Sequence, residues 1–127
     1  MIKQLALVGL GGAAGSILRF LISVYSIKWF PTTSFPLGTF IVNIFGSLLL
    51  GVIMGYVLKT ETNTEQLRLL IGIGFCGGFT TFSTFAYENI SMIQQNNYSQ
   101  FLLYAAVSLI VGLLAILLGV WLSKSFI

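Results

Sequence analysis

Four long runs of apolar residues, separated by short polar segments, dominate the sequence. They cover about residues 5–25, 37–58, 67–93 and 101–122, and each reaches the roughly 20 residues that a helix needs to cross a bilayer. Backbone groups in lipid must be hydrogen-bonded internally, so we expect four transmembrane helices. Residues 1–127 are therefore predicted to form one all-α, four-helix domain of a polytopic membrane protein.

The polar segments between the runs are short, which makes consecutive helices antiparallel neighbours. Pro31 and Pro36 interrupt the helical pattern between the first two runs. Thr62 and Glu65 have the spacing of a capping box at the start of the third run, and polar residues 94–97 turn the chain into the fourth. Glycines spaced four apart, at 11/15, 51/55 and 74/78, predict close helix packing in lipid.

Composition supports the bilayer as the solvent and excludes several functions. Hydrophobic residues make up 57% of the chain and charged residues 7%, against about a quarter charged in soluble domains. The net charge of +3 comes from scattered residues, so we expect no nucleic-acid binding. The chain has no histidine and a single cysteine, Cys76, and no nucleophile stands beside a base. We therefore expect no enzyme activity.

The third run is unusual because glycines and four hydroxyls lie where the middle of the bilayer should be. Gly77 and Gly78 weaken a helix by roughly 1 kcal/mol each, and we predict that the third helix is broken near its middle. Carbonyls freed there would form an oxygen cage for a small cation such as sodium. The alternative is an unbroken, weak helix whose threonines bond the preceding turn.

Phe79, Phe82 and Phe85 recur at every third position of this run. Such a stripe is usually packed core, but the positive edge of a phenyl ring can also face an anion. Weak attraction of this kind suits a pore, which needs easy entry and easy exit. Arg19, inside the first run, either extends its charge to the membrane surface or faces a polar vestibule.

Polar side chains one helical turn apart mark two further runs. The second run carries Thr39, Asn43 and Ser47, and the fourth carries Tyr104 and Ser108, with a glycine at the next position of that face. These groups either join helices or donate hydrogen bonds to a small passenger. An anion that holds its hydration shell tightly would need such donors.

Three segments resemble the signature segments of the Fluc (CrcB) family of fluoride channels. They are residues 15–19 (GSILR), 38–43 (GTFIVN) and 74–85 (GFCGGFTTFSTF), and the chain also has the length and span number of that family. The resemblance implies two antiparallel subunits, two fluoride pathways and a structural sodium ion that is not transported.

The same resemblance implies roles for individual residues. The backbone carbonyls of Gly77 and Thr80 would bind sodium. The fluoride pathway would be lined by Asn43, Phe82, Phe85, Arg19, Thr39, Ser83, Thr84, Tyr104 and Ser108. Gly112 departs from the serine of some family members, which leaves the far end of the polar row on the fourth span open.

The resemblance implies a passive fluoride-selective channel of the cell membrane that lowers cytoplasmic fluoride. A small four-span multidrug exporter is the alternative, although its acidic residue deep in the first span is missing here. A noncatalytic assembly or scaffold protein is a third reading. An antiparallel homodimer is favoured, with a heterodimer of oppositely oriented paralogues still open. With the amino terminus inside, Lys3, Lys59, Arg68 and Lys124 would be cytoplasmic, and only Lys28, with or without Arg19, would be outside. A dual-topology homodimer should have nearly balanced loop charges, so this bias favours the heterodimer.

Overall fold

The computed structural model describes residues 1–61 and 63–127, and the regular elements within these residues are all helices. Within these residues four segments are long and apolar enough to cross a membrane. Three are single helices: α1 (Ile2–Trp29), α2 (Leu37–Lys59) and α6 (Tyr98–Phe126). The fourth is the composite third span, Glu65–Gln94. The prediction of an all-α protein with four membrane-spanning segments is confirmed.

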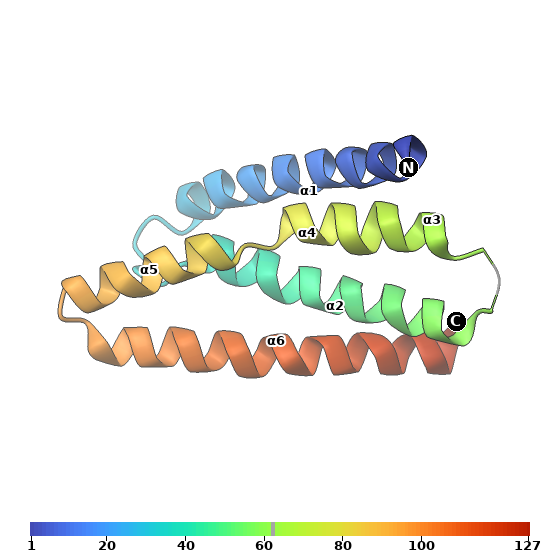
Figure 1. The fold of residues 1–127 in the computed structure, drawn as a ribbon. Helices are drawn as coiled ribbons and strands as arrows, with labels where there is room; N and C mark the ends of the chain where they lie inside the picture. The colour runs from blue at the N-terminus through green and yellow to red at the C-terminus, as the bar shows by residue number, and fades with distance from the viewer. Residues whose placement is uncertain (62) are drawn as a thin grey trace.

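The third span consists of four short elements in series (Figure 1). These are α3 (Glu65–Leu67), the wider π-helical η1 (Arg68–Phe75), α4 (Cys76–Phe79) and α5 (Phe82–Gln94). Between α4 and α5, Thr80 has φ −82° and ψ 160°, and Thr81 has φ −150° and ψ 119°. Both residues are therefore extended, while the span as a whole bends by 19°. We call Thr80–Thr81 the extended stretch.

The third span packs against different helices along its length. α2 packs along α6, α1 packs against η1 and α4, and α5 packs against α6. Both chain termini lie at the end of the bundle that carries α3, and the α5–α6 turn lies at the opposite end (Figure 1). The first half of the third span is thus supported by α1, and its second half by α6.

Glycines allow these helices to approach closely, as their spacing predicted. A β-carbon at Gly15 would collide with the backbone of Phe75 and Phe79, and one at Gly51 with the carbonyl of Ile116. At Gly78 it would meet the backbone of Gly12. Backbone contact of this kind maximises packing where lipid supplies no hydrophobic driving force between helices.

The connecting segments follow the local chemistry of the sequence. Pro36 precedes the first residue of α2, where its missing N–H leaves no hydrogen bond unmade. Asn96 has φ 58°, a left-handed conformation that asparagine tolerates, and the Asn97 side chain accepts a hydrogen bond from the Gln100 amide at the start of α6. The predicted capping box begins at Thr62, which lies outside the described residues.

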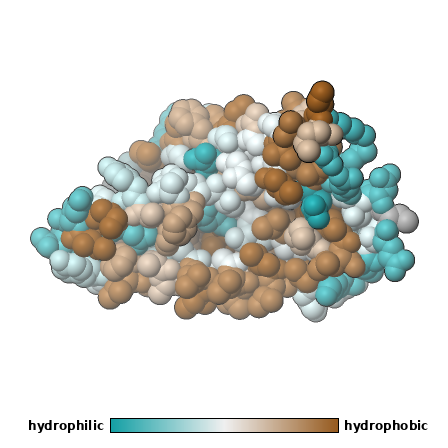
Figure 2. All heavy atoms as spheres, in the orientation of Figure 1, coloured by the Kyte–Doolittle hydropathy of each residue, from teal (hydrophilic) through white to brown (hydrophobic). Residues whose placement is uncertain are grey.

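Few large side chains are fully buried within one copy of the chain: Val42, Tyr104 and Ser123 are the largest described ones. Many leucines and isoleucines of α1 and α6 are exposed instead. Figure 2 shows hydrophobic residues along α6 and hydrophilic residues at both ends of the molecule. This distribution matches a bilayer with water at its two faces.

Candidate functional site

Asn43 holds the extended stretch of the third span against α2. Its Nδ2 donates to the Thr81 carbonyl at 3.1 Å, and its Oδ1 accepts from the Thr81 amide at 2.8 Å. One side-chain amide thus replaces both backbone partners of Thr81. Because an unpaired backbone group in lipid would cost several kcal/mol, roughly as for any buried polar group, this pair of bonds makes the extended conformation tolerable.

The extended stretch removes the usual helical donors from two carbonyls. The Thr81 amide would bond the Gly77 carbonyl in a continuous helix, but it donates to Asn43 instead. The Thr84 amide would bond the Thr80 carbonyl, but it donates to Thr81 Oγ1 at 3.2 Å. Gly77 and Thr80 therefore carry carbonyl oxygens that lack their ordinary helical donors. A β-carbon at Gly77 would have no neighbour within 4 Å, so space is open beside it.

Arg19 bonds the backbone next to the extended stretch. Its Nε donates to the Gly78 carbonyl at 3.0 Å, and Ser16 Oγ donates to the same carbonyl at 3.4 Å. The guanidinium thus has a partner at the level of α4 within the bundle. The sequence left two hypotheses for Arg19: a polar environment within the protein, or extension of its charge to the membrane surface. The contact with the Gly78 carbonyl agrees better with the first.

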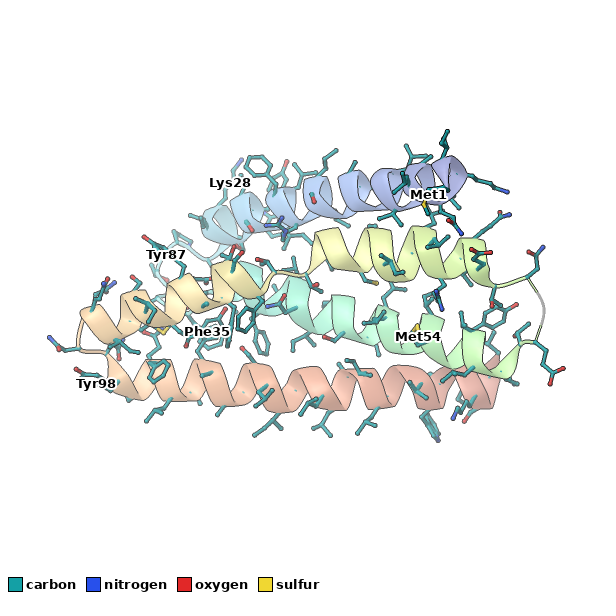
Figure 3. The ribbon with its side chains drawn as sticks, in the orientation of Figure 1. Met1, Lys28, Phe35, Met54, Tyr87 and Tyr98 are labelled. Atoms are coloured by element: carbon teal, nitrogen blue, oxygen red, sulfur yellow. The ribbon has the colours of Figure 1, made fainter. Side chains whose placement is uncertain are left out.

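A cavity of about 680 Å³ opens between α2 and the first half of the third span, and we call it the α2–α4 cavity. Met54 lies in the half of the molecule that carries α3 and α4 (Figure 3) and lines this cavity. Five predicted site residues lie in the lining, together with Ser47, Thr81, Cys76 and Arg68: Asn43, Gly77, Thr80, Phe82 and Phe85. The structure therefore brings together the two predicted sodium ligands, the amide and both phenyl rings.

Phe82 is 80% exposed and lies at the open side of the α2–α4 cavity. Phe85 lies deeper and meets the ring of Tyr104 at a centroid distance of 5.1 Å and an angle of 62°. The centroids of the Phe82 and Phe85 rings are 6.1 Å apart. The stripe therefore divides into a packed ring and an exposed ring. An exposed phenyl group at mid-membrane depth is available to lipid, to an ion or to a second chain.

A second, smaller pocket of about 370 Å³ lies among α1, α2 and α5, and we call it the hydroxyl pocket. Thr39 Oγ1 donates to Glu88 Oε1 there at 2.5 Å, and Thr84 lines the same pocket. Phe35, on the half of the molecule that carries α5, forms part of its wall (Figure 3). The remaining polar lining comes from Ser23, Ser26, Thr33 and Ser34.

The other predicted residues lie close to these cavities without lining the larger one. Ser83 and Thr84 form a hydroxyl cluster with Thr81, at oxygen distances of 3.4 and 3.2 Å. Tyr104 is fully buried, and neither its hydroxyl nor that of Ser108 has a hydrogen-bond partner of good geometry in the described chain. Buried hydroxyls in proteins are usually hydrogen-bonded, so these two groups are still able to bond a further polar partner.

Sequence reasoning assigned no role to Glu88 and placed Ser47 only in the polar row of the second run. Glu88 lies four residues beyond the hydroxyl cluster, and only the packing of the folded bundle brings its carboxylate to Thr39. The described residues hold no group of three or more acidic, cysteine or histidine side chains that could bind a metal. Backbone and side-chain oxygens of the extended stretch are therefore the oxygen ligands that the site offers to a cation.

Residues 6–120 match the family model described as CrcB-like protein, Camphor Resistance (CrcB). The chain belongs to the CrcB family. Similar CrcB-like chains include a protein of Azobacteroides pseudotrichonymphae, 41% identical over 126 residues, which cover 99% of this chain and all of that protein. A protein of Phocaeicola vulgatus is 43% identical over 122 residues, covering 96% and 99% of the two chains. One from Leptospira interrogans is 40% identical over 127 residues, covering 98% and 97%.

Each of these three relatives is named "Fluoride-specific ion channel FluC". Because the matches run the full length of both partners, the CrcB assignment covers all four spans, the extended stretch and both cavities. Membership in a channel family also agrees with the expectation that the chain is not an enzyme.

Proposed function

We propose that this chain is the subunit of a passive, fluoride-selective channel in the cell membrane. The observation that carries the proposal is the set of groups at the extended stretch: an amide and two phenyl rings line the α2–α4 cavity, and the hydroxyl cluster lies beside it. These groups can replace the hydration shell of a small anion without binding it as tightly as a buried cation would. The names of the full-length relatives support the same passenger.

Such a channel needs no coupled energy source to protect the cell. An inside-negative membrane potential drives a monovalent anion outward by roughly 2.3 kcal/mol per 100 mV. A selective pore therefore keeps cytoplasmic fluoride below the external concentration. The exporter alternative has no comparable support. It requires an acidic residue deep in the first span, whereas Glu88 lies on the third span and is hydrogen-bonded to Thr39.

The second part of the proposal is that Thr80–Thr81 is a functional break in the third helix that holds a sodium ion. The carbonyls of Gly77 and Thr80, which have lost their helical donors, would be its ligands, and space is open beside Gly77. Carbonyl oxygens suit a hard monovalent cation. When bound, the ion would place a fixed positive charge at the centre of the membrane.

The third part is an antiparallel dimer, with a homodimer favoured over a pair of paralogues. Two carbonyls are too few for a sodium shell, and Gly77 and Phe82 are exposed on the same open side of one copy. A second copy placed there would complete the shell and cover the phenyl ring. Closed two-fold symmetry makes such self-complementary contacts the common solution.

Within the dimer we assign each pathway residue a role that follows from its place. Arg19 would attract the anion toward the hydroxyls of Ser83 and Thr84. Phe82, Phe85 and Asn43 would line the narrow region. The remaining donors would be Thr39, Tyr104 and Ser108, which lie toward the α5–α6 half of the bundle.

Purified protein in liposomes tests the channel directly. Vesicles loaded with potassium fluoride or potassium chloride are diluted into anion-free buffer, and valinomycin is added to carry potassium. We expect fluoride release far faster than chloride release, from this chain alone and without a paralogue. Equal rates, or no release of either halide, would refute the channel. Release that requires a co-expressed paralogue would refute the homodimer only.

A further inference from the structure

The hydroxyl of Ser47 lies between the α2–α4 cavity and α6. Ser47 lines that cavity one helical turn after Asn43. On the other side, a β-carbon at Gly112 of α6 would lie 4.0 Å from Ser47 Oγ and 4.0 Å from Ile44 Cδ1. The hydroxyl thus stands opposite Gly112, the position where the polar row of α6 loses its side chain.

Gly112 differs from the packing glycines in the same helix pair. A β-carbon at Gly119 would collide with the backbone of Leu48 and Val52, and one at Gly51 would collide with Ile116. At Gly112 the two nearest atoms are side-chain atoms at ordinary van der Waals distance. The missing side chain at Gly112 therefore leaves room beside Ser47, and is not required by close contact between the helix backbones.

The Ser47 hydroxyl is also free to reorient. Serines and threonines in membrane helices commonly donate to the carbonyl of the preceding turn, as Ser23 does to Arg19 and Thr80 does to Cys76. Ser47 makes no such bond among the side-chain hydrogen bonds of the described chain. Its O–H can therefore turn toward a ligand in the cavity without first breaking a bond within the helix.

The polar groups one turn away on α2 and α6 do not fill the position beside Gly112. Asn43 is committed to the Thr81 backbone through both its Oδ1 and one Nδ2 hydrogen. Ser108 Oγ is buried and unpartnered one turn before Gly112 on α6. The row Tyr104, Ser108 and Gly112 would therefore end at Ser108, unless the next donor came from α2.

We propose that Ser47 is that donor: its hydroxyl replaces the one missing at Gly112 and forms part of the anion pathway. The pathway would then pass from the hydroxyls of α6 to α2 at this level. This inference rests on the proposed fluoride channel and adds to it a residue that determines the transport rate and the preference for a strongly hydrated anion.

Moving the hydroxyl from one helix to the other tests the proposal. Fluoride and chloride release from liposomes are measured for Ser47→Ala, Gly112→Ser and the double variant, with Ser91→Ala, outside both cavities, as the matched control. We expect Ser47→Ala to slow fluoride release by roughly tenfold, the effect of losing one hydrogen bond to a charged group. Gly112→Ser in that background should restore most of the rate, because the added hydroxyl fits the same space.

Two results would overturn the assignment. Fluoride release by Ser47→Ala at the wild-type rate would remove the hydroxyl from the pathway. A slower rate that Gly112→Ser does not restore would make Ser47 a packing residue. If the alanine variant does not fold, Ser47→Cys keeps the shape of the side chain, although it is slightly larger, with a weaker donor, and is judged by the same criteria. Wild-type protein that releases no fluoride would refute the channel itself, which separates that failure from failure of the Ser47 role.

Discussion

Individual residues at the extended stretch act through hydrogen bonds that a substitution can remove one at a time. Asn43 is both donor and acceptor to Thr81, which neither a carboxylate nor an aliphatic side chain can reproduce. Phe82 differs from Asn43, because it is 80% exposed in one copy of the chain. Substitution of Asn43 should therefore affect the folded chain itself, whereas substitution of Phe82 should affect transport.

Asn43→Asp should reduce both stability and fluoride release. The aspartate cannot donate to the Thr81 carbonyl, and leaving that group unpaired costs about 1–3 kcal/mol. Thermal unfolding in detergent and release from liposomes measure the two effects. Gln95→Glu makes the same chemical change at an exposed position near the α5–α6 turn and should leave both unchanged. Full activity of the aspartate variant would show that Asn43 does not hold the stretch.

Phe82→Ile should leave the thermal stability of the protein nearly unchanged and slow fluoride release several-fold. The isoleucine keeps an apolar surface but lacks the positive ring edge, whose contribution is about 0.5–1.5 kcal/mol by analogy with aromatic pairs. Phe20→Ile, on the exposed face of α1, is the matched control and should transport at the wild-type rate. If both variants transport equally well, Phe82 faces only lipid or the partner chain.

At the scale of elements, the packing of α1 against η1 and α4 fixes the first half of the third span. Gly11 and Gly15 bring the α1 backbone into contact with residues 70–79, and Arg19 and Ser16 add bonds to the Gly78 carbonyl. The extended stretch therefore starts from a firmly held α4. The second half, α5, is attached through α6 and through the Asn43 bonds of α2.

Gly15→Ala should destabilise the protein, because the added methyl group meets the backbone of Phe75 and Phe79. Overpacking of this kind costs about 1–3 kcal/mol. Gly9→Ala, on the same helix with no neighbour within 4 Å, should instead be neutral or stabilising by about 0.5–1 kcal/mol through helix propensity. Thermal unfolding of the two variants side by side checks the difference, and equal effects would contradict this packing of α1.

At the scale of the whole molecule, one copy of the chain looks incomplete for its proposed task. Few large side chains are fully buried, Phe82 is exposed, and the carbonyls of Gly77 and Thr80 lack their helical donors next to the open space at Gly77. A second copy would cover this side and share the proposed cation. Assembly and cation binding should therefore be thermodynamically linked.

Sodium should raise the thermal stability of the purified protein relative to potassium at equal ionic strength. A ligand present at about 100 times its dissociation constant stabilises the state that binds it by roughly 2.7 kcal/mol. Unfolding temperature and dimer content by cross-linking are measured in each salt, with the large organic cation N-methyl-D-glucammonium as the reference free of alkali-metal ions. Identical values in all three media would argue against the carbonyls of Gly77 and Thr80 as a sodium site.

The sequence by itself determined the four spans, the turns at Pro36 and Asn96–Asn97 and the glycine contacts. These features depend on the length and period of apolar runs and on local backbone preference, which short segments already contain. The sequence also indicated that the residues around the extended stretch form a candidate site, because glycines and hydroxyls are unfavourable in contact with lipid.

Only the tertiary structure decided which of these groups meet. Thr81 lies 38 residues from Asn43, and Gly78 lies 59 residues from Arg19. Glu88 on Thr39, and Ser47 opposite Gly112, likewise depend on the rotation and depth of one helix against another. A helical period gives the face on which a side chain lies but not the neighbour that the face will meet. That pairing is set by the fit of all the side chains at each helix interface, which is a property of the packed bundle.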